Sequence, residues 1–288
     1  MDVDARKTLV QLHTEWDGCT KCPLGVSRVA MRGLYVAGEG AQRGVYFLTA
    51  GPSRQESEEG RPWQHPANRL VLRTLKALGF TAEDIYVSHA TGCRSCTQAT
   101  DGGGHVVLRE NRMTGKMEPV WRDDVPTPAA LGACKPRTLE EIYLVDPVLV
   151  VTLGESPMKQ LLGSTKGYKN NIGKVFPLEF PGAGIQADLT EKGRKWARRV
   201  AGNTVFPVKP NMVEYRVFVG IDPRDIQREW IDQGHDNILR RFVEQMHVVY
   251  NILQKHRQLT TGVVPLRKPV SLAQIEVDLR KKEAEHGY

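Results

Sequence analysis

The length, composition and charge of the chain are those of a globular protein, and its apolar stretches argue against a membrane-spanning protein and against a secreted one. The chain has 288 residues, of which 40% are hydrophobic and 25% charged, an ordinary globular composition with enough apolar residues for a buried core. No apolar stretch is long enough to cross a bilayer, and the first residues lack the apolar core of a secretory signal. A formal net charge of +7 and a pI of about 9.2 favour a polyanionic partner, although many globular proteins are mildly basic. We expect a cytoplasmic monomer without membrane contact; the sequence names no protein partner.

Strands and helices are expected to alternate along the chain. Short apolar runs rich in β-branched and aromatic residues predict buried strands, and apolar residues at helical spacing predict helices. In chain order, we expect a helix over 7–16, a strand over 45–50, a helix over 70–78 ended by Gly79, a strand over 85–89, a helix around 139–143, a strand over 147–153, a helix over 158–162, a strand over 217–221, and a helical pattern over 226–259 interrupted near Gly234.

This alternation predicts the fold class. It is typical of a three-layer α/β/α domain in which a mainly parallel sheet is covered by helices on both faces. In such a sheet the loops at the carboxyl ends of the strands carry the reactive groups. Those loops here are 50–56, 89–93, 154–155 and 222–223.

Two segments are interpreted as insertions into a domain that spans 1–235, with a C-terminal helix and charged tail over 236–288. The first, near 97–128, has the turn residues and alternation of a β-hairpin arm. The second, near 180–211, is rich in Gly and in basic residues. It either follows a phosphate backbone or forms a solvated helix face. Its basic residues are Lys192, Arg194, Lys195, Arg198 and Arg199.

Five cysteines in a reducing compartment are better suited to metal binding than to disulfides. Cys19 and Cys22 stand in a pair that can bind one ion, and Cys93, Cys96 and Cys134 follow. Four thiolates fit tetrahedral zinc or an iron–sulfur cluster. The alternative is that Cys93 and Cys134 are buried apolar fillers.

Several short motifs follow one another along the chain in a characteristic order. They are Cys19-Thr20-Lys21-Cys22-Pro23-Leu24, Gly51-Pro52 with Glu56, Gly60-Arg61-Pro62-Trp63, Ser88-His89 with Cys93-Arg94, Cys134 with Leu139 and Glu141-Ile142, and Leu153-Gly154 with Leu161-Leu162-Gly163. Their order and spacing resemble the family 4 uracil-DNA glycosylases, which carry a 4Fe–4S cluster and belong to the uracil-DNA glycosylase superfamily. The resemblance covers about 19–230, less the two insertions.

The resemblance implies a DNA partner and an N-terminal lobe around a structural 4Fe–4S cluster. The ligands it implies are Cys19, Cys22, Cys93 and Cys134. Cys96 is extra, although Cys93 to Cys96 is itself a two-cysteine pair that could compete. Zinc remains the alternative metal.

The resemblance also assigns a substrate pocket. Gly51, Pro52 and Ser53 belong to its first loop, and Trp63 takes the place of an aromatic residue that stacks on the flipped base. Glu56 is a carboxylate that could orient water or hold the loop. The competing interpretation of Trp63 is a core tryptophan after a turn.

Three pocket positions depart from the family pattern. Ala50 replaces a glutamate of the first loop, and His89 replaces an asparagine that reads the edge of uracil. A neutral imidazole nitrogen offers either a donor or an acceptor, whereas an amide offers both. Asp222 stands where the family has a histidine, and it could donate a hydrogen bond only if its pKa were raised enough to keep it protonated. Without a chemical role, His89 would be a satisfied strand-end histidine and Asp222 a turn residue before Pro223.

The sequence therefore favours a DNA glycosylase of altered specificity that flips and excises uracil or a modified pyrimidine. Its expected catalytic residues are Glu56, His89 and Asp222, with His89 also reading the base edge. One alternative is a catalytically silent relative that binds DNA in replication or repair. Another is an unrelated zinc-binding α/β protein.

Overall fold

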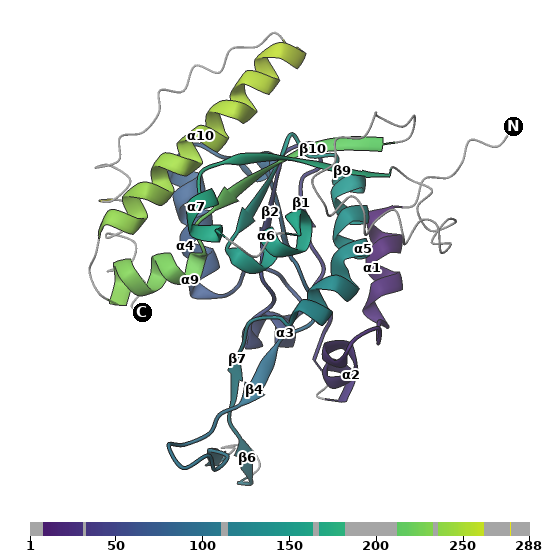
Figure 1. Cartoon of the computed structure of the whole chain (residues 1–288), viewed down its shortest axis with the longest axis vertical. Coiled ribbons are helices and arrows are strands. Elements are labelled where there is room, and N and C mark those ends of the chain that lie inside the picture. Colours follow the sequence, from purple (N-terminus) through teal and green to yellow (C-terminus); the bar gives the residue numbers. More distant parts are fainter. Residues whose placement is uncertain are drawn as a thin grey trace, which may run out of the picture.

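The computed structural model describes residues 8–30, 33–110, 115–163, 167–181, 212–232 and 236–261, and the single position Val277. Within these ranges no helix is long and apolar enough to cross a membrane. Six strands form one sheet, in the order β1-β3-β2-β8-β10-β9 (Figure 1). Their bounds are Glu39–Gly40 (β1), Val45–Thr49 (β2), Ile85–His89 (β3), Leu149–Leu153 (β8), Val175–Pro181 (β9) and Met212–Gly220 (β10).

The four inner strands run parallel. Val45 of β2 lies opposite Ile85 of β3 on one side and Leu149 of β8 on the other, and Val217 of β10 lies opposite Val150 of β8. All residues of β2 and β8 are buried, because helices cover both faces of the sheet. The edge strands β1 and β9 are antiparallel. The predicted mainly parallel α/β fold is confirmed, and each of the four expected strands is present.

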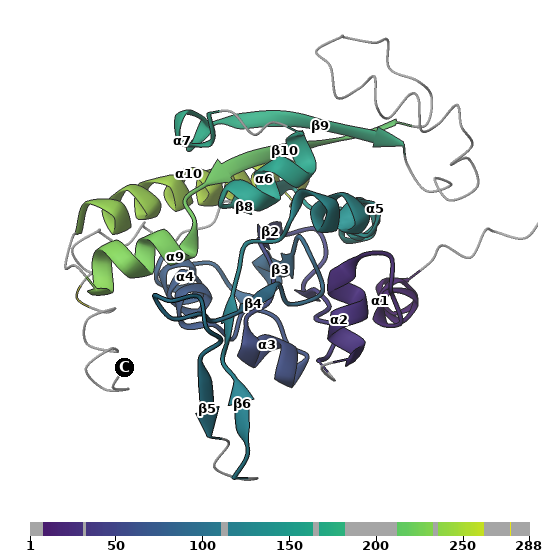
Figure 2. The same cartoon turned by 60° about the horizontal axis from the view of Figure 1, so that its bottom comes forward.

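Helices lie in layers on the two faces of the sheet, and Figure 2 shows α4, α9 and α10 on one side with α5 and α6 on the other. Helices α1 and α2 lie beyond α5. The bounds are Leu9–Asp17 (α1), Pro23–Ala30 (α2), Arg54–Glu59 (α3), Pro66–Ala77 (α4), Ala82–Asp84 (η1, a 3₁₀ turn), Pro128–Val145 (α5), Glu155–Leu162 (α6), Tyr168–Asn171 (α7), Pro223–Ile226 (α9), Gln227–Asp232 (η3, a π-helical segment) and Asp236–Thr261 (α10).

Two hydrophobic cores follow from this layering. The first lies between the sheet and α4, α9 and α10, and it contains Phe47, Leu75, Phe218 and Phe242. The C-terminal helix α10 therefore packs in the same core as the sheet. The second core lies between the sheet and α5 and α6. A smaller cluster of Leu12, Trp16 and Tyr35 fixes α1.

A β arm projects from the body in both views (Figures 1 and 2). Its paired strands lie within the first segment that the sequence marks as an insertion, apart from Cys96, which precedes it. They are Cys96–Gln98 (β4) with Trp121–Asp123 (β7), and Leu108–Glu110 (β5) with Met117–Pro119 (β6). The second expected insertion begins within β9, and its basic run lies outside the described residues.

A charged cluster lies between the sheet, α5 and α1, and its Glu141 and Arg137 side chains are fully buried. Glu141 accepts hydrogen bonds from Tyr46, Tyr86, Ser88 and Arg137. His13 of α1 lies 3.0 Å from the same carboxylate. Burial would raise the pKa of Glu141, but Arg137 and His13 outweigh it and lower the pKa to about 2. The cluster joins α1, two strands and α5 through one ionised group.

The lowered pKa of Glu141 predicts acid sensitivity. Because the folded pKa lies below the ordinary value of 4.5, the ionised carboxylate contributes stability that is complete above pH 4.5 and is lost as pH falls towards 2. We expect the free energy of unfolding to fall over that range. The Glu141→Gln variant should be less stable at pH 6 and should lack this part of the decline. Urea unfolding at stepped pH measures both, and equal pH dependence in the two proteins would contradict the assignment.

Candidate functional site

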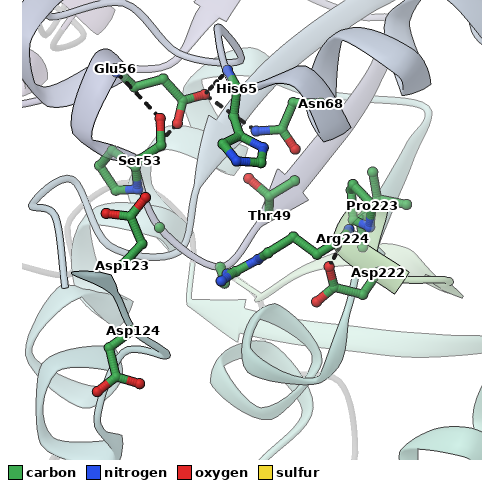
Figure 3. Close-up of a pocket in the computed structure, with 14 residues that line it drawn as sticks. Thr49, Ser53, Glu56, His65, Asn68, Asp123, Asp124, Asp222, Pro223 and Arg224 are labelled. Atoms are coloured by element: carbon green, nitrogen blue, oxygen red, sulfur yellow. Dashed lines mark hydrogen bonds between the residues drawn. The ribbon is translucent and has the colours of Figure 1, made fainter. Parts of the chain in front are cut away.

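A cavity lies at the carboxyl ends of the parallel strands, as the fold class predicts. It is formed by the ends of β2, β8 and β10, the starts of α3, α4 and α9, and the base of the arm; Figure 3 shows its polar side chains. The lining residues are Thr49, Ala50, Gly51, Pro52, Ser53, Glu56, His65, Asn68, Asp123, Asp124, Leu153, Asp222, Pro223 and Arg224.

The expected first loop forms one wall of this cavity. Gly51 approaches Thr91 so closely that an added Cβ would lie 2.7 Å from Thr91 Oγ1. Pro52 follows, and Ser53 caps α3 by accepting a hydrogen bond from the Glu56 amide. The structure therefore places Gly51, Pro52 and Ser53 together at the cavity.

Glu56 is a fully buried carboxylate at the edge of the cavity. Its Oε2 accepts a hydrogen bond of 2.7 Å from the Ser53 amide, and its Oε1 accepts from the His65 amide and from Asn68 Nδ2 at 3.2 Å. Burial would raise the pKa of Glu56, but His89 and the Ser53 hydrogen bonds hold it well below the ordinary value. Glu56 is therefore an ionised acceptor at neutral pH.

His89 lies behind Glu56 and does not line the cavity. Its side chain is fully buried, with Nδ1 2.7 Å from Thr49 Oγ1 and Nε2 3.6 Å from Glu56 Oε1. This placement differs from the expectation that His89 reads the base edge. Its position at the end of β3 and its contact with Glu56 instead suit a positioning residue.

Trp63 also lies away from the cavity. Its side chain is 1% exposed, its ring packs edge-on against Phe47, and its Nε1 donates a hydrogen bond to the Ser88 carbonyl. The ring offers no free face for a base in this conformation. Of the two interpretations left open by the sequence, the placement is that of a core tryptophan.

Asp222 lines the cavity opposite Glu56 (Figure 3). It caps α9 by accepting a hydrogen bond of 2.8 Å from the Arg224 amide. It also fills the space beside Gly154, where an added Cβ would lie 2.6 Å from Asp222 Oδ2. Burial raises the pKa of Asp222 above its ordinary value.

Comparison with known proteins settles the family. The family model for the uracil DNA glycosylase superfamily matches residues 37–246. The chain belongs to the uracil DNA glycosylase superfamily.

Among the relatives, the chain is 27% identical to the type-4 uracil-DNA glycosylase of Thermotoga maritima over 158 residues, which cover 54% of this chain and 66% of the relative. It is 26% identical to that of Pyrobaculum aerophilum over 184 residues, 63% of this chain and 79% of the relative. It is 22% identical to that of Archaeoglobus fulgidus over 211 residues, which cover 73% of this chain and 85% of the relative. The family 4 resemblance drawn from the motifs is confirmed.

Sequence reasoning missed several residues that line this superfamily member's cavity. His65 and Asn68 come from the start of α4, and Asp123 and Asp124 come from the base of the arm. Asp123 is paired with Arg94 at 2.6 Å. The dipeptide His65-Pro66 could have been read as a helix start, because Pro favours the first helical position. No local signal points from these residues to a pocket.

The cysteines of this superfamily member divide into two groups. Burial raises the pKa of Cys134, and the thiols of Cys22 and Cys19 raise it further. Burial raises the pKa of Cys93 to about 11, Arg28 opposes the rise, and Cys134 and Cys22 add to it. Cys134 therefore lies within electrostatic reach of Cys19, Cys22 and Cys93, and Cys93 also lies within reach of Cys22.

Cys96 lies apart from that group. It belongs to β4 of the arm, and its charged neighbours are Arg94, Asp123 and Asp124. Across the described ranges, no three His, Cys, Asp or Glu side chains are grouped closely enough to hold a single metal ion.

Proposed function

We propose that this chain is a DNA glycosylase that hydrolyses the bond between deoxyribose and uracil or a related pyrimidine. The observation that carries the proposal is Glu56, an ionised carboxylate held by three N–H donors at the edge of a cavity in the superfamily's fold. The names of the relatives support uracil as the first base to test. The departures at Ala50, His89 and Asp222 support an altered specificity.

The lowered pKa of Glu56 decides which catalytic role suits it. A carboxylate whose pKa is held low is a weak proton acceptor, so general-base catalysis is a poor use of it. It is well suited to stabilise the positive charge that develops on the sugar as the bond to the base breaks. The same oxygens can orient the water that attacks C1′. The bonding electron pair leaves with the base, and the proton that the water loses neutralises the base anion.

Asp222 is placed to stabilise the departing base by donating a hydrogen bond to it. An ionised carboxylate would repel the developing base anion, whereas the protonated form donates a hydrogen bond to it. The raised pKa of Asp222 favours the protonated form more than in a free aspartate. Acidic groups around the cavity also favour entry of a neutral base and disfavour entry of a phosphate.

A base-release assay tests the proposal. Iron-replete protein would be incubated with single- and double-stranded oligonucleotides that carry uracil, 5-hydroxymethyluracil or hypoxanthine, and alkali would reveal abasic sites. Release of uracil or 5-hydroxymethyluracil supports the proposed function and identifies the specificity, whereas release of hypoxanthine alone would support a glycosylase but overturn the preference for pyrimidines. Tight DNA binding without release of any base would favour the silent binding module.

We propose that a 4Fe–4S cluster is held by the four grouped thiols. A cubane cluster binds each thiolate at a different iron, so its ligands lie farther apart than the ligands of one ion. The proposal is supported by the electrostatic effects that connect Cys19, Cys22 and Cys93 with Cys134, and by the similarity to the type-4 uracil-DNA glycosylases. When bound, the cluster would supply a structural link between the N-terminal lobe and α5. Its proposed ligands are Cys19, Cys22, Cys93 and Cys134.

The cluster proposal predicts a selective effect of two cysteine substitutions. Purified protein should contain iron and acid-labile sulfide in equal amounts. Cys93→Ser should lose most of the iron and unfold at lower urea concentration, because metal binding contributes to folding. Cys96→Ser should retain both iron and stability. Zinc without sulfide, or equal iron loss in the two variants, would contradict the assignment.

A further inference from the structure

Two side chains at the start of α4 form a polar edge of the cavity. Asn68 is buried and His65 is half-buried, and both lie beside Glu56 (Figure 3). Both residues line the cavity, whereas His89, the residue expected to read the base, lies beneath Glu56.

The hydrogen bonds of His65 fix the position of its proton. Its Nδ1 accepts a hydrogen bond of 3.2 Å from the Ala67 amide, and an amide N–H can only donate. Burial lowers the pKa of His65, so the ring is neutral at pH 7 and its single proton is on Nε2. His65 therefore presents a hydrogen-bond donor.

The contact with Glu56 fixes the orientation of Asn68 in the same way. An ionised carboxylate can only accept, so the amino group of Asn68 must be the side that meets Glu56 Oε1 at 3.2 Å. The carbonyl oxygen Oδ1 is turned away from Glu56. Asn68 therefore presents a hydrogen-bond acceptor.

We propose that His65 and Asn68 read the base. A neighbouring donor and acceptor complement a lactam edge, in which a ring N–H stands beside a carbonyl, as in N3–H and O4 of uracil. Asn68 Oδ1 accepts from the ring N–H, and His65 Nε2 donates to the carbonyl. The pair supplies the amide-like recognition that the sequence lacks at His89. The inference rests on the proposed function, because it names the base chemistry of the same site.

The test measures base recognition separately from cleavage. The probe is an oligonucleotide with 2′-fluoro-2′-deoxyuridine, whose fluorine withdraws electrons from the sugar and opposes bond cleavage; a matched oligonucleotide carries an abasic analogue. Binding of both is compared in iron-replete wild type, His65→Ser, Asn68→Ala and Lys76→Ala. Ser retains the helix cap, and Lys76 is an exposed control on the same helix.

We expect the preference of the wild type for the uracil probe over the abasic one to fall about tenfold in His65→Ser and in Asn68→Ala, and to persist in Lys76→Ala. A third probe carries a methyl group on N3 of uracil. It should bind more weakly to the wild type, and the penalty should vanish in Asn68→Ala because the acceptor is already gone.

An unchanged preference in both variants, a methyl penalty that persists in Asn68→Ala, or no preference for uracil in the wild type would overturn the inference. A different result would overturn the proposed function. In that result the wild type recognises the fluorinated uracil through these residues and yet releases no base from DNA that carries unmodified deoxyuridine. It would support base recognition by His65 and Asn68 and would overturn the proposed glycosylase activity.

Discussion

Replacing Glu56 by Gln should slow base release by about 100-fold or more, with a much smaller effect on DNA affinity. The neutral amide cannot stabilise positive charge on the sugar. Its amino group must also replace one of the two oxygens that accept from Ser53, His65 and Asn68, so one donor would face another donor. Single-turnover excision of uracil gives the rate, and binding to DNA with an abasic analogue gives the affinity.

Glu59→Gln is the matched control for this prediction. Glu59 lies on the same helix, is exposed, and accepts a hydrogen bond only from the Gln55 side chain among the contacts described for it. The same chemical change there should leave both rate and affinity within about twofold. If Glu56→Gln were as active as wild type, Glu56 would hold the loop and take no part in the reaction.

The parts of the fold that the sequence predicts are those with a local pattern. The apolar runs of β2, β3, β8 and β10 and the helical spacing of α4 and α10 need no knowledge of distant residues. Strand β9 lacks such a pattern because Pro177 and Pro181 interrupt it. Prolines are tolerated at a sheet edge, and that is where β9 lies.

The place of the cavity was predicted, but only some of the residues that line it were. The position of the cavity at the strand ends, and the place of Gly51, Pro52 and Ser53 in its first loop, follow from local sequence. The burial of His89 depends on α3, a six-residue helix that the sequence does not reveal, because its carboxylate Glu56 covers the end of β3. The entry of Asn68 into the cavity depends on how α4 packs against the sheet, and no spacing rule encodes that packing.

Removing one partner of the buried pair Arg137 and Glu141 should be among the most damaging changes in the chain. Both side chains are fully buried and 3.2 Å apart. Arg137→Met would leave Glu141 charged with His13 as its remaining basic neighbour, and losing one partner of a buried ion pair typically costs about 3–5 kcal/mol. Urea unfolding of the iron-replete protein measures this. Arg137→Met with Glu141→Leu should recover part of the loss, since no unpaired charge remains.

The exposed pair Arg54 and Glu58 is the control for this comparison. Its atoms lie 2.6 Å apart, closer than in the buried pair, yet both side chains are more than half exposed, and Glu58→Gln should cost less than about 1 kcal/mol. Equal costs in the two pairs would show that burial does not decide the energetics.

The consequence of losing Arg137 should extend from stability to the site. Arg137 also donates to the carbonyl of His89 at the end of β3, and it lies on α5 one turn after Cys134. One buried guanidinium thus fixes both the residue that contacts Glu56 and the helix that carries a proposed cluster ligand. We therefore expect Arg137→Met to lower uracil excision and iron content together, whereas Glu56→Gln should lower excision with iron content unchanged.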